Sequence, residues 1–367
     1  MLLKIIQEIL KEKTYLSISS FINLALYHPE FGYYQKKNPF GMGGDFVTSP
    51  QISSLFNEVI SLFFIYQFKK NWKEGKKIHF LELGAGNGFF IKDFLTLVSK
   101  VPTMAANLEV TLVEISEKLQ AEQREKIKEF EGKINVKWEK NTLDALEQIP
   151  DSEDTLIFVF SNEFFDAFPI NQFIKHEGKW HEVCVVPAEN NEELSFGFTH
   201  FDFTLAVQKH LELLSVEDEA IKGGEILEVS NDAIEIFTEV CRKIKQNKGV
   251  MLTVDYGFLK TEFISTLQSV KNHKPNEVFE NIGEADITYL VNFELLFYIA
   301  SGEGLNTYAP ITQKAFLESI GILEKLKILL AKEESEAKRY ALQTSTDRIT
   351  GADQMGELFK VLICENY

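Results

Sequence analysis

A glycine-rich turn between a predicted strand and a predicted helix is the part of this sequence best suited to chemistry. The apolar run 78–81 ends at Glu82, and Gly84, Gly86 and Gly88 follow at alternate positions. The apolar residues that come next recur with a period of 3.6, which predicts a helix. They are Phe90, Ile91, Phe94, Leu95 and Val98. Glycines let a backbone approach a ligand closely, and a helix N-terminus favours anionic groups, so the turn predicts a nucleotide-type cofactor site. A turn that only joins a buried strand to a helix is the alternative.

The spacing of these glycines excludes two common phosphate-binding motifs. Phe89 occupies the position that would complete Gly-x-Gly-x-x-Gly, and the chain contains no Gly-Lys-Ser or Gly-Lys-Thr. The turn is therefore neither a dinucleotide fingerprint nor a P-loop. With Glu82 at the end of the strand, it resembles the first motif of S-adenosylmethionine-dependent methyltransferases.

Polar residues also follow the next two predicted strands, at the edge where a doubly wound sheet binds its ligands. The strand 108–114 ends in Glu114, whose carboxylate could accept hydrogen bonds from both hydroxyls of a ribose. The strand 133–138 leads to Asn141, whose amide has the paired donor and acceptor that would bind an adenine edge. The alternatives are a helix-capping acid for Glu114 and a turn former for Asn141.

The fourth predicted strand, 155–161, leads into a loop with an unusual combination of side chains. Asn162, Glu163 and Asp166 stand there beside three phenylalanines. Aromatic rings could shape a pocket around a methyl donor. Carboxylates could hold a cationic acceptor, because a guanidinium pairs bidentately with carboxylates. Capping of the following helix is the alternative for both acids.

A glycine loop at 41–50 carries one further candidate, Asp45. Such a loop could close over a bound cofactor and exclude water. A surface turn is the alternative for this segment.

The composition of the 367-residue chain limits the kinds of partner and site. A net charge of −17 disfavours a nucleic-acid partner. Three distant cysteines and seven histidines without ligand spacing predict neither a disulfide framework nor a metal site. No apolar stretch is as long as a membrane span, and residues 1–10 predict an amphipathic helix rather than a targeting segment. We therefore expect a cytoplasmic protein.

Alternating strand and helix signals predict an α/β fold with a parallel sheet covered by helices. The predicted core strands lie near 78–83, 108–114, 133–138, 155–161, 249–257 and 358–364. Residues 1–27 are helical in pattern, and Ser49 or Ser53 begins a long apolar helix that runs to about Phe68. Residues 170–203 predict an inserted antiparallel β-meander.

Seven motifs in a fixed order resemble one family, the MidA-type methyltransferases, whose mitochondrial members act as respiratory complex I assembly factors. The resemblance covers nearly the whole chain. The motifs begin at Tyr27 (Tyr-x-Pro-x-x-Gly-Tyr-Tyr), Gly44 (Gly-Asp-Phe-x-Thr-Ser-Pro), Leu81 (Leu-Glu-Leu-Gly-x-Gly-x-Gly), Asn162 (Asn-Glu-Phe-Phe-Asp-x-x-Pro), Val254 (Val-Asp-Tyr-Gly), Ala285 (Ala-Asp-Ile-Thr) and Met355 (Met-Gly-Glu-Leu-Phe-Lys-Val).

The resemblance implies a class I methyltransferase fold, which is Rossmann-like, with a seven-stranded sheet whose last strand is antiparallel. An N-terminal helical or cap region would span residues 1–72. The cofactor-binding core would comprise 73–169, 223–257 and 305–367. Two insertions, 170–222 and 258–304, would form a substrate-side subdomain.

The resemblance also implies S-adenosylmethionine as the methyl donor and, for the mitochondrial branch, dimethylation of a protein arginine. The predicted cofactor-binding residues are Glu82, Gly84, Gly86, Gly88, Glu114, Asn141 and Asn162. The predicted catalytic residues are Glu163, Asp166 and Asp45. We expect a protein substrate, no nucleic acid, no membrane span and no metal, and a homodimer is left open.

Three positions depart from the family pattern. Gln51 stands where the family usually has Glu, Asn57 where it has Gly, and Asn292 where it has Asp. Gln51 and Asn292 each remove a carboxylate, which bears on how a charged substrate is recognised. The glycine motif itself is intact.

Two other functions are alternatives. The chain could be a non-catalytic assembly or binding factor with a vestigial cofactor site. An NAD-dependent oxidoreductase is disfavoured by Phe89 and by the lack of a catalytic His paired with Lys or Tyr.

Overall fold

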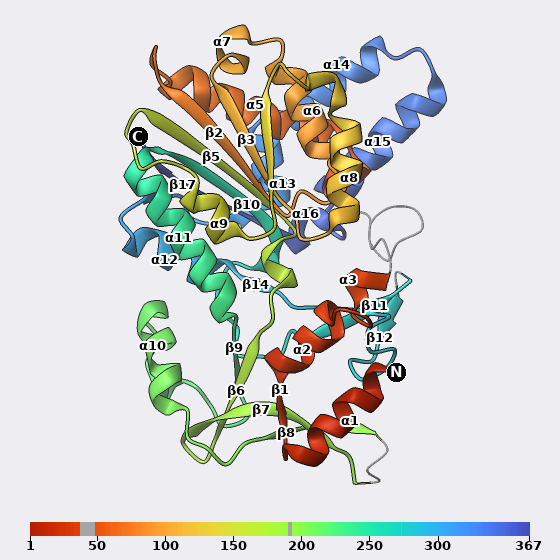
Figure 1. Ribbon diagram of the computed structural model, residues 1–367, viewed down its shortest axis with the longest axis vertical. Helices are drawn as coiled ribbons and strands as arrows, with labels where there is room; N and C mark the ends of the chain where they lie inside the picture. The colour runs from red at the N-terminus through yellow and green to blue at the C-terminus, as the bar shows by residue number, and fades with distance from the viewer. Residues whose placement is uncertain (37–47, 190–192, 273) are drawn as a thin grey trace. The chain divides into compact units, whose positions relative to one another are not determined.

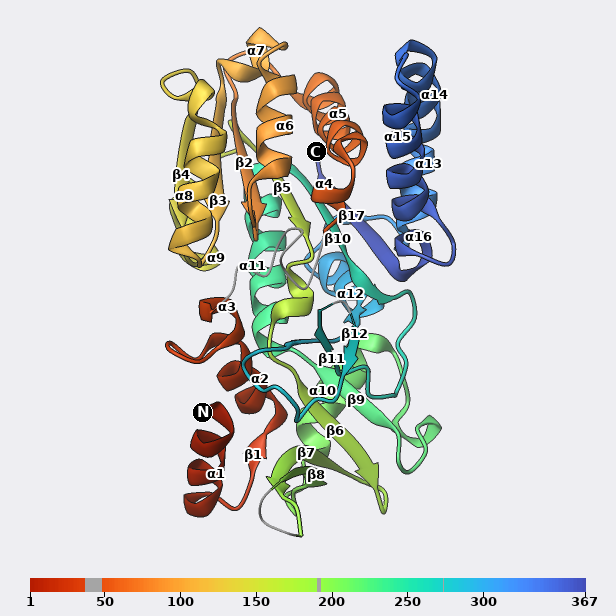
Figure 2. The same ribbon diagram turned by 90° about the vertical axis from the view of Figure 1, so that its right-hand side faces the viewer.

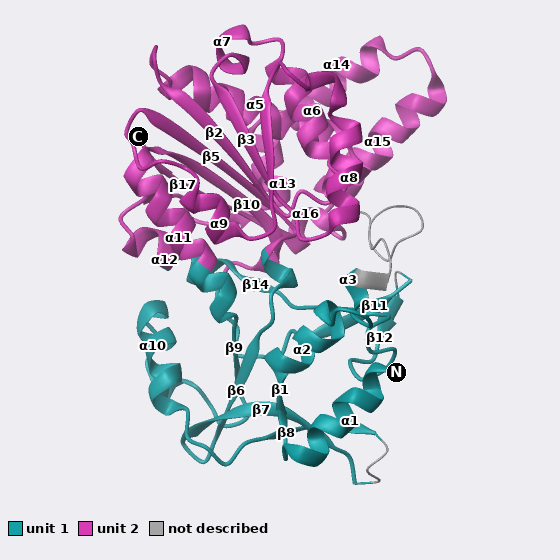
Figure 3. Cartoon of the chain, in the orientation of Figure 1, with its two compact units in different colours: residues 1–46, 165–235, 260–298 teal, residues 47–164, 236–259, 299–367 magenta. Residues whose placement is uncertain are grey.

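The computed structural model describes residues 1–36, 48–189, 193–272 and 274–367 (Figures 1 and 2). The chain divides into two compact units (Figure 3). Unit 1 comprises Met1–Phe46, Phe165–Glu235 and Lys260–Tyr298, and unit 2 comprises Val47–Phe164, Ile236–Leu259 and Ile299–Tyr367. Within the described residues, no helix is both long and apolar enough to cross a membrane.

A twisted sheet forms the centre of unit 2 (Figure 1). Its main path contains seven strands: β15 (Asn306–Thr307), β17 (Phe359–Asn366), β10 (Gly249–Phe258), β5 (Thr155–Asn162), β2 (Lys77–Leu83), β3 (Leu108–Val113) and β4 (Asn135–Glu139). The five strands from β10 to β4 are parallel, and β17 is antiparallel to β10. The short β16 (Ile311–Thr312) also pairs with β17. The predicted class I fold is therefore confirmed.

Helices join the parallel strands as the sequence pattern predicts. The helices of unit 2 are α4 (Ser49–Ile52), α5 (Ser54–Asn71), α6 (Phe89–Val98), α7 (Pro102–Ala105), α8 (Glu117–Lys126), η1 (Lys128–Phe130), α9 (Thr142–Glu147), α13 (Gln313–Ser319), α14 (Ile322–Lys332), α15 (Glu336–Thr350) and α16 (Met355–Leu358). Two more, α11 (Asn231–Asn247) and α12 (Phe293–Gly302), begin in unit 1 and end in unit 2. Ser53 is the N-cap residue of α5, the long apolar helix expected there.

Phenylalanines pack α5 and α6 against the sheet. Phe64 of α5 contacts Phe80 of β2 edge to face, with ring centroids 5.1 Å apart. Phe80 stacks on Phe94 of α6 at 4.2 Å, and Phe90 lies 4.3 Å from Phe160 of β5. All five rings are almost fully buried. Such aromatic pairs add to the free energy gained by burying apolar area, so this cluster fixes α6, and with it the turn that precedes α6, on the strand ends.

Unit 1 contains the antiparallel meander that the sequence predicts between residues 170 and 203. Its larger sheet contains β1 (Leu16–Ser17), β7 (Lys179–Pro187), β6 (Asn171–His176) and β9 (Ile226–Val229), with β8 (Leu194–Phe198) paired to β7. The smaller sheet contains β12 (Lys274–Asn276), β11 (Gln268–Lys271) and β13 (Asp286–Thr288). Trp180 is completely buried in a core that α10 (Thr204–Leu214) covers.

The N-terminal helical pattern is divided in the structure. It forms α1 (Leu2–Glu12) and α2 (Ile18–Tyr27), and a short α3 (Tyr33–Lys36) follows. The break between α1 and α2 contains β1, in which Leu16 pairs with Val185 of β7. The side chain of Ser17 then caps α2 by accepting the backbone N–H of Ser20 at 3.1 Å. The pairing of β1 with a strand distant in the sequence therefore interrupts a segment whose local pattern indicates a single helix.

The unit boundaries differ from the expected ranges in several places, and the two longest segments concerned are 47–72 and 223–235. Residues 47–72 belong to unit 2 because α5 packs into the phenylalanine core there. Residues 223–235 belong to unit 1, since β9 pairs with β6 of the meander. Neither the packing of α5 nor the pairing of β9 can be recognised from the composition of these segments.

Candidate functional site

The glycine turn of unit 2 has the backbone conformation that only glycine adopts without strain. Gly84, Gly86 and Gly88 have φ angles of +69°, +53° and +74°. The turn leaves β2 and is fixed to β3, because the N–H groups of Gly84 and Ala85 both donate to the carbonyl of Val113, at 3.0 and 3.2 Å. Gly88 is then the N-cap residue of α6. Strand, glycine turn and helix thus occur as the sequence predicts.

Side chains of α8 donate hydrogen bonds to the backbone carbonyls of this turn. Gln123, which is fully buried, donates from Nε2 to the carbonyl of Gly86 at 2.5 Å and accepts the indole N–H of Trp138 at 2.8 Å. One turn later, the ammonium of Lys126 donates to the carbonyl of Asn87 at 2.6 Å. Two successive carbonyls of the turn are therefore fixed by side chains of α8.

Two buried carboxylates stand at the ends of β2 and β3. Glu114 accepts the N–H of Gly86 at 3.0 Å and that of Ser116 at 2.9 Å. Burial raises the pKa of Glu114 to about 7, against the hydrogen bonds from the backbone. Burial and the charge of Glu114 raise the pKa of Glu82 well above its usual value. Since two like charges close together in a poorly solvated place are costly, this pair favours a ligand that brings donors or a positive charge.

The residues of this turn fit S-adenosylmethionine. Oε2 of Glu82 is buried and has no hydrogen-bond partner among the described residues, so it can accept from a ligand's ammonium group. A Cβ on Gly86 would meet nothing closer than 3.9 Å, so there is space beside that α-carbon. A Cβ on Gly84 would lie 2.9 Å from Cδ2 of Phe164, which closes the other side of the turn.

Asn141 has a structural task in addition to its predicted one. It is the N-cap residue of α9, and its Oδ1 accepts the N–H of Leu143 at 2.7 Å and that of Asp144 at 3.4 Å. The alternative that the sequence left open, a polar residue that shapes the turn after a strand, is therefore present in the structure. Contact with an adenine stays a prediction for this residue.

The loop after β5 brings Asn162 and Glu163 together in unit 2. The amide of Asn162 donates to Oε1 of Glu163 at 3.1 Å, and the N–H of Ser49 donates to the same oxygen at 3.4 Å. Oδ1 of Asn162 is buried and has no partner in the described part of the chain. A carboxylate held in this way can accept further hydrogen bonds from a cationic group.

Asp166 lies in unit 1, although only two residues separate it from Glu163. Its Oδ2 accepts the hydroxyl of Thr288 at 3.1 Å, and burial raises the pKa of Asp166 to about 6. The hydroxyl of Tyr27 donates to the carbonyl of the next residue, Ala167, at 2.7 Å. Three motifs of the sequence, those beginning at Tyr27, Asn162 and Ala285, therefore meet at Asp166.

Asp45 is outside the described residues, so its predicted role stays a prediction. Two of the three departures from the family pattern, Asn57 and Asn292, have hydrogen-bond partners in the structure. Asn57 donates to the carbonyl of Pro50 at 3.0 Å and to Asp93 at 2.8 Å, which ties α4 and α5 to α6. In unit 1, Asn292 accepts the N–H of Leu295 at 3.0 Å in the first turn of α12.

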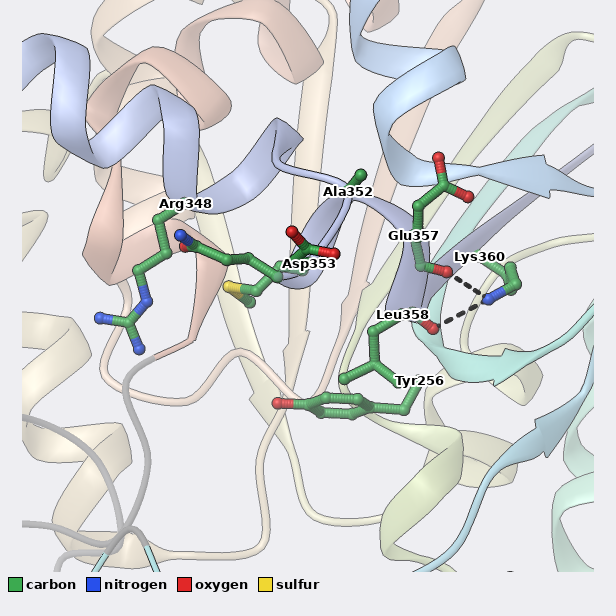
Figure 4. A pocket seen from close by; sticks show the side chains of 9 residues that line it. Tyr256, Arg348, Ala352, Asp353, Glu357, Leu358 and Lys360 are labelled. Carbon is green, nitrogen blue, oxygen red and sulfur yellow. Dashed lines mark hydrogen bonds between the residues drawn. The ribbon is translucent and has the colours of Figure 1, made fainter.

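A recess of about 610 Å³ opens where β10 ends and β17 begins, in unit 2 (Figure 4). Tyr256 and Leu358 form part of its apolar lining, and Arg348, Asp353 and Glu357 bring charges of both signs. In a parallel sheet, ligands bind outside the carboxyl ends of the strands, and Tyr256 lies at that end of β10. No group of three or more His, Cys, Asp or Glu suited to a metal occurs in the described residues.

Comparison with known sequences identifies the family. Residues 59–311 match the family Methyltransf_28, described as S-adenosyl-L-methionine-dependent methyltransferases. The chain belongs to this family. It is a methyltransferase whose methyl donor is S-adenosylmethionine, in agreement with the glycine turn and with Glu82 and Glu114. The cofactor supplies an electrophilic methyl group on a sulfonium.

Two curated relatives of this methyltransferase come from vertebrates. The protein arginine methyltransferase NDUFAF7, mitochondrial, of Danio rerio is 30% identical over 358 residues, which cover 94% of this chain and 82% of the relative. The protein of the same name from Homo sapiens is 28% identical over 365 residues, with 94% and 78% covered.

Solved structures support the fold. A COG1565 superfamily member from Burkholderia thailandensis bound to S-adenosyl-homocysteine has a TM-score of 0.79 at 23% identity, and the match covers 100% of this chain and 92% of that one. A native structure of a COG1565 protein from the same organism has a TM-score of 0.76 at 22% identity, with the same coverage.

Sequence reasoning missed Gln123, Lys126 and Asp255 as residues that position the site. Gln123 and Lys126 belong to α8, and this helix is so rich in charged residues that its sequence suggests a fully exposed helix. Asp255 is in a recognised motif, but nothing in the sequence shows that its carboxylate accepts the N–H of Phe164. Only the fold reveals which distant backbone group each side chain meets.

Proposed function

We propose that this methyltransferase transfers a methyl group to the side chain of an arginine in a protein. The observation that carries the proposal is that both relatives named above, matched over 94% of this chain, are protein arginine methyltransferases. The carboxylate of Glu163, already oriented by Asn162, supports it chemically.

Glu163 would bind and orient the guanidinium. Its oxygens accept N–H groups, and a guanidinium presents these in a planar fork. Held in this way, one guanidinium nitrogen forms a bond to the methyl carbon while the bond from that carbon to sulfur breaks. The proton that leaves the nitrogen passes to a carboxylate or to water, and the products are methylarginine and S-adenosyl-homocysteine. Most of the acceleration would come from orientation.

Labelled methyl donor tests the proposal. The purified protein and its Glu163→Gln variant are incubated with cell extract and isotopically labelled S-adenosylmethionine, and labelled residues are identified by mass spectrometry. We expect methylarginine in one or a few proteins with the wild type and at least a tenfold loss with the variant. Label in lysine or in a small molecule would refute the arginine acceptor while leaving the methyltransferase intact.

A further inference from the structure

The turn after β5 contains a strained residue at the proposed acceptor site. Glu163 has a φ of +52°, in the left-handed region that residues with a side chain rarely adopt. Such a conformation persists only where the surrounding structure enforces it, and it is frequent at functional sites. Phe164 follows directly, and its ring lies against Gly84 of the glycine turn. The turn therefore connects the proposed acceptor-binding carboxylate to the wall of the cofactor site.

The carboxylate of Asp255, at the end of β10, holds this turn. Oδ2 accepts the N–H of Phe164 at 3.1 Å, and Oδ1 accepts the N–H of Tyr256 at 2.9 Å. The neighbouring N–H, that of Glu163, donates to the carbonyl of Val254 at 3.0 Å. Asp255 is completely buried, so water does not compete for these two hydrogen bonds. Two successive N–H groups of the turn are thus fixed by two successive residues of β10.

We propose that Asp255 is a positioning residue that imposes the left-handed conformation on Glu163. It thereby aims the carboxylate of Glu163 at the acceptor. The inference rests on the proposed function for the role of Glu163, but the hold of Asp255 on the turn is a separate statement about the fold. Asp255 itself, being enclosed, does not contact the substrate.

A double-mutant cycle tests the link between the two acids. Methyl transfer to the labelled acceptor is measured for Asp255→Asn, Glu163→Gln and the double variant. We expect each single change to lower the rate at least tenfold and the double variant to be no slower than Glu163→Gln. Asp255→Asn should change the dissociation constant for S-adenosyl-homocysteine, measured by calorimetry, less than threefold. Losses that multiply, an unchanged rate in Asp255→Asn, or a cofactor affinity weakened tenfold would overturn the proposal.

Thermal unfolding tests the hold on the turn without any acceptor. Glu163→Gly and Glu163→Ala both lack the carboxylate, and only glycine adopts the left-handed conformation without strain. We expect the Gly variant to melt about 2 °C above the Ala variant. In the Asp255→Asn background this difference should disappear, because the turn can relax. An equal difference in both backgrounds would overturn the proposal.

Controls separate this inference from the proposed function. Asp154→Asn, at an exposed aspartate just before β5, should behave as the wild type in both experiments. If the wild type methylates no arginine, the proposed function fails, and the unfolding comparison still decides whether Asp255 holds the turn. If the wild type methylates arginine and the cycle shows no coupling, only the role of Asp255 fails.

Discussion

Glu82 and Glu114 show how single residues determine the properties of the cofactor turn. Both carboxylates are less than one-tenth exposed, and the charge of Glu114 raises the cost of ionising Glu82. Without a ligand, the pair holds at least one proton more readily than exposed acids would. A ligand with hydroxyl and ammonium donors compensates the charges, so binding and proton release are coupled.

Cofactor affinity should therefore depend on pH. The pKa of Glu114 is raised to about 7, so the carboxylate form that would accept the ribose hydroxyls predominates only above that pH. We expect S-adenosyl-homocysteine to bind roughly tenfold more weakly at pH 6 than at pH 8, as measured by calorimetry. Glu114→Gln should bind weakly at both values. A wild-type affinity that does not change over this range would contradict the role of Glu114.

The stability of the unliganded protein should change in the opposite direction. Because the folded-state pKa of Glu114 lies above the unfolded value of 4.5, its contribution to stability is present below pH 4.5 and is lost as pH rises through about 7. The melting temperature of Glu114→Gln should consequently fall less than that of the wild type over this range. This check distinguishes titration of Glu114 from a general effect of pH on the ligand.

Gly84 allows a test of whether the cofactor site is used at all. In Gly84→Val, the new side chain would combine strain at a φ of +69° with a clash against Phe164. We expect no measurable binding of S-adenosyl-homocysteine and no methyl transfer. Gly132→Val is the matched control, since Gly132 has a φ of +73° and open space around it. If a cellular phenotype survives Gly84→Val, the non-catalytic assembly factor becomes the better explanation.

At the scale of elements, α8 acts as a brace for the turn between β2 and α6. Its contribution runs through Gln123, which links the carbonyl of Gly86 to the indole of Trp138 on β4. The three glycines are free to adopt other conformations in the unfolded chain, so external hydrogen bonds are needed to select one. The brace explains how so glycine-rich a segment can be a defined binding surface.

Removing this brace should weaken cofactor binding without unfolding the protein. Gln123→Leu keeps the approximate volume but loses both hydrogen bonds, which are worth about 1 kcal/mol each. We expect roughly tenfold weaker binding of S-adenosyl-homocysteine in calorimetry. Gln148→Leu removes an exposed hydrogen bond to Glu139 and should leave the affinity unchanged. Equal affinities for wild type and Gln123→Leu would show that the turn holds its shape alone.

Local patterns predicted most elements because the signals themselves are local. The strands from β2 to β5, the turn at Gly84 and the helix begun by Ser53 follow from apolar periodicity, glycine and capping residues. The break between α1 and α2 was not predictable, since it depends on the pairing of Leu16 with Val185. The left-handed conformation of Glu163 was not predictable for the same reason, because the turn that contains Glu163 is hydrogen-bonded to β10, a strand distant in sequence.

At the scale of the whole molecule, one chain forms two units, and it passes between them several times. The boundaries at residues 46, 164, 235, 259 and 298 give each unit three separate segments. Glycine turn, Glu114 and Gln123 all belong to unit 2, whereas Asp166 belongs to unit 1. The sequence predicted the glycine turn, Glu114 and Asp166 but not Gln123, and the allocation of residues to units depends on pairings across the chain, such as that of β9 with β6.

Hydrogen exchange should show that the cofactor stabilises one unit more than the other. With S-adenosyl-homocysteine at about 100 times its dissociation constant, ligand binding adds about 2.7 kcal/mol to the stability of the folded form that binds it. We expect slower exchange in residues 77–126 of unit 2 and little change around Trp180, which is buried in a separate core of unit 1. Equal protection of both regions would mean that the units unfold together.

The order of strands along the chain has a consequence for synthesis of the protein. β10 is complete at Phe258, but its antiparallel neighbour β17 begins only at Phe359. While the ribosome adds the residues between them, β10 presents an apolar edge with unpaired backbone groups, which is a template for aggregation. By pairing with β10, β17 therefore also covers this exposed edge. A nascent chain that stalls before Phe359 would be a natural client for chaperones, whatever the state of its cofactor site.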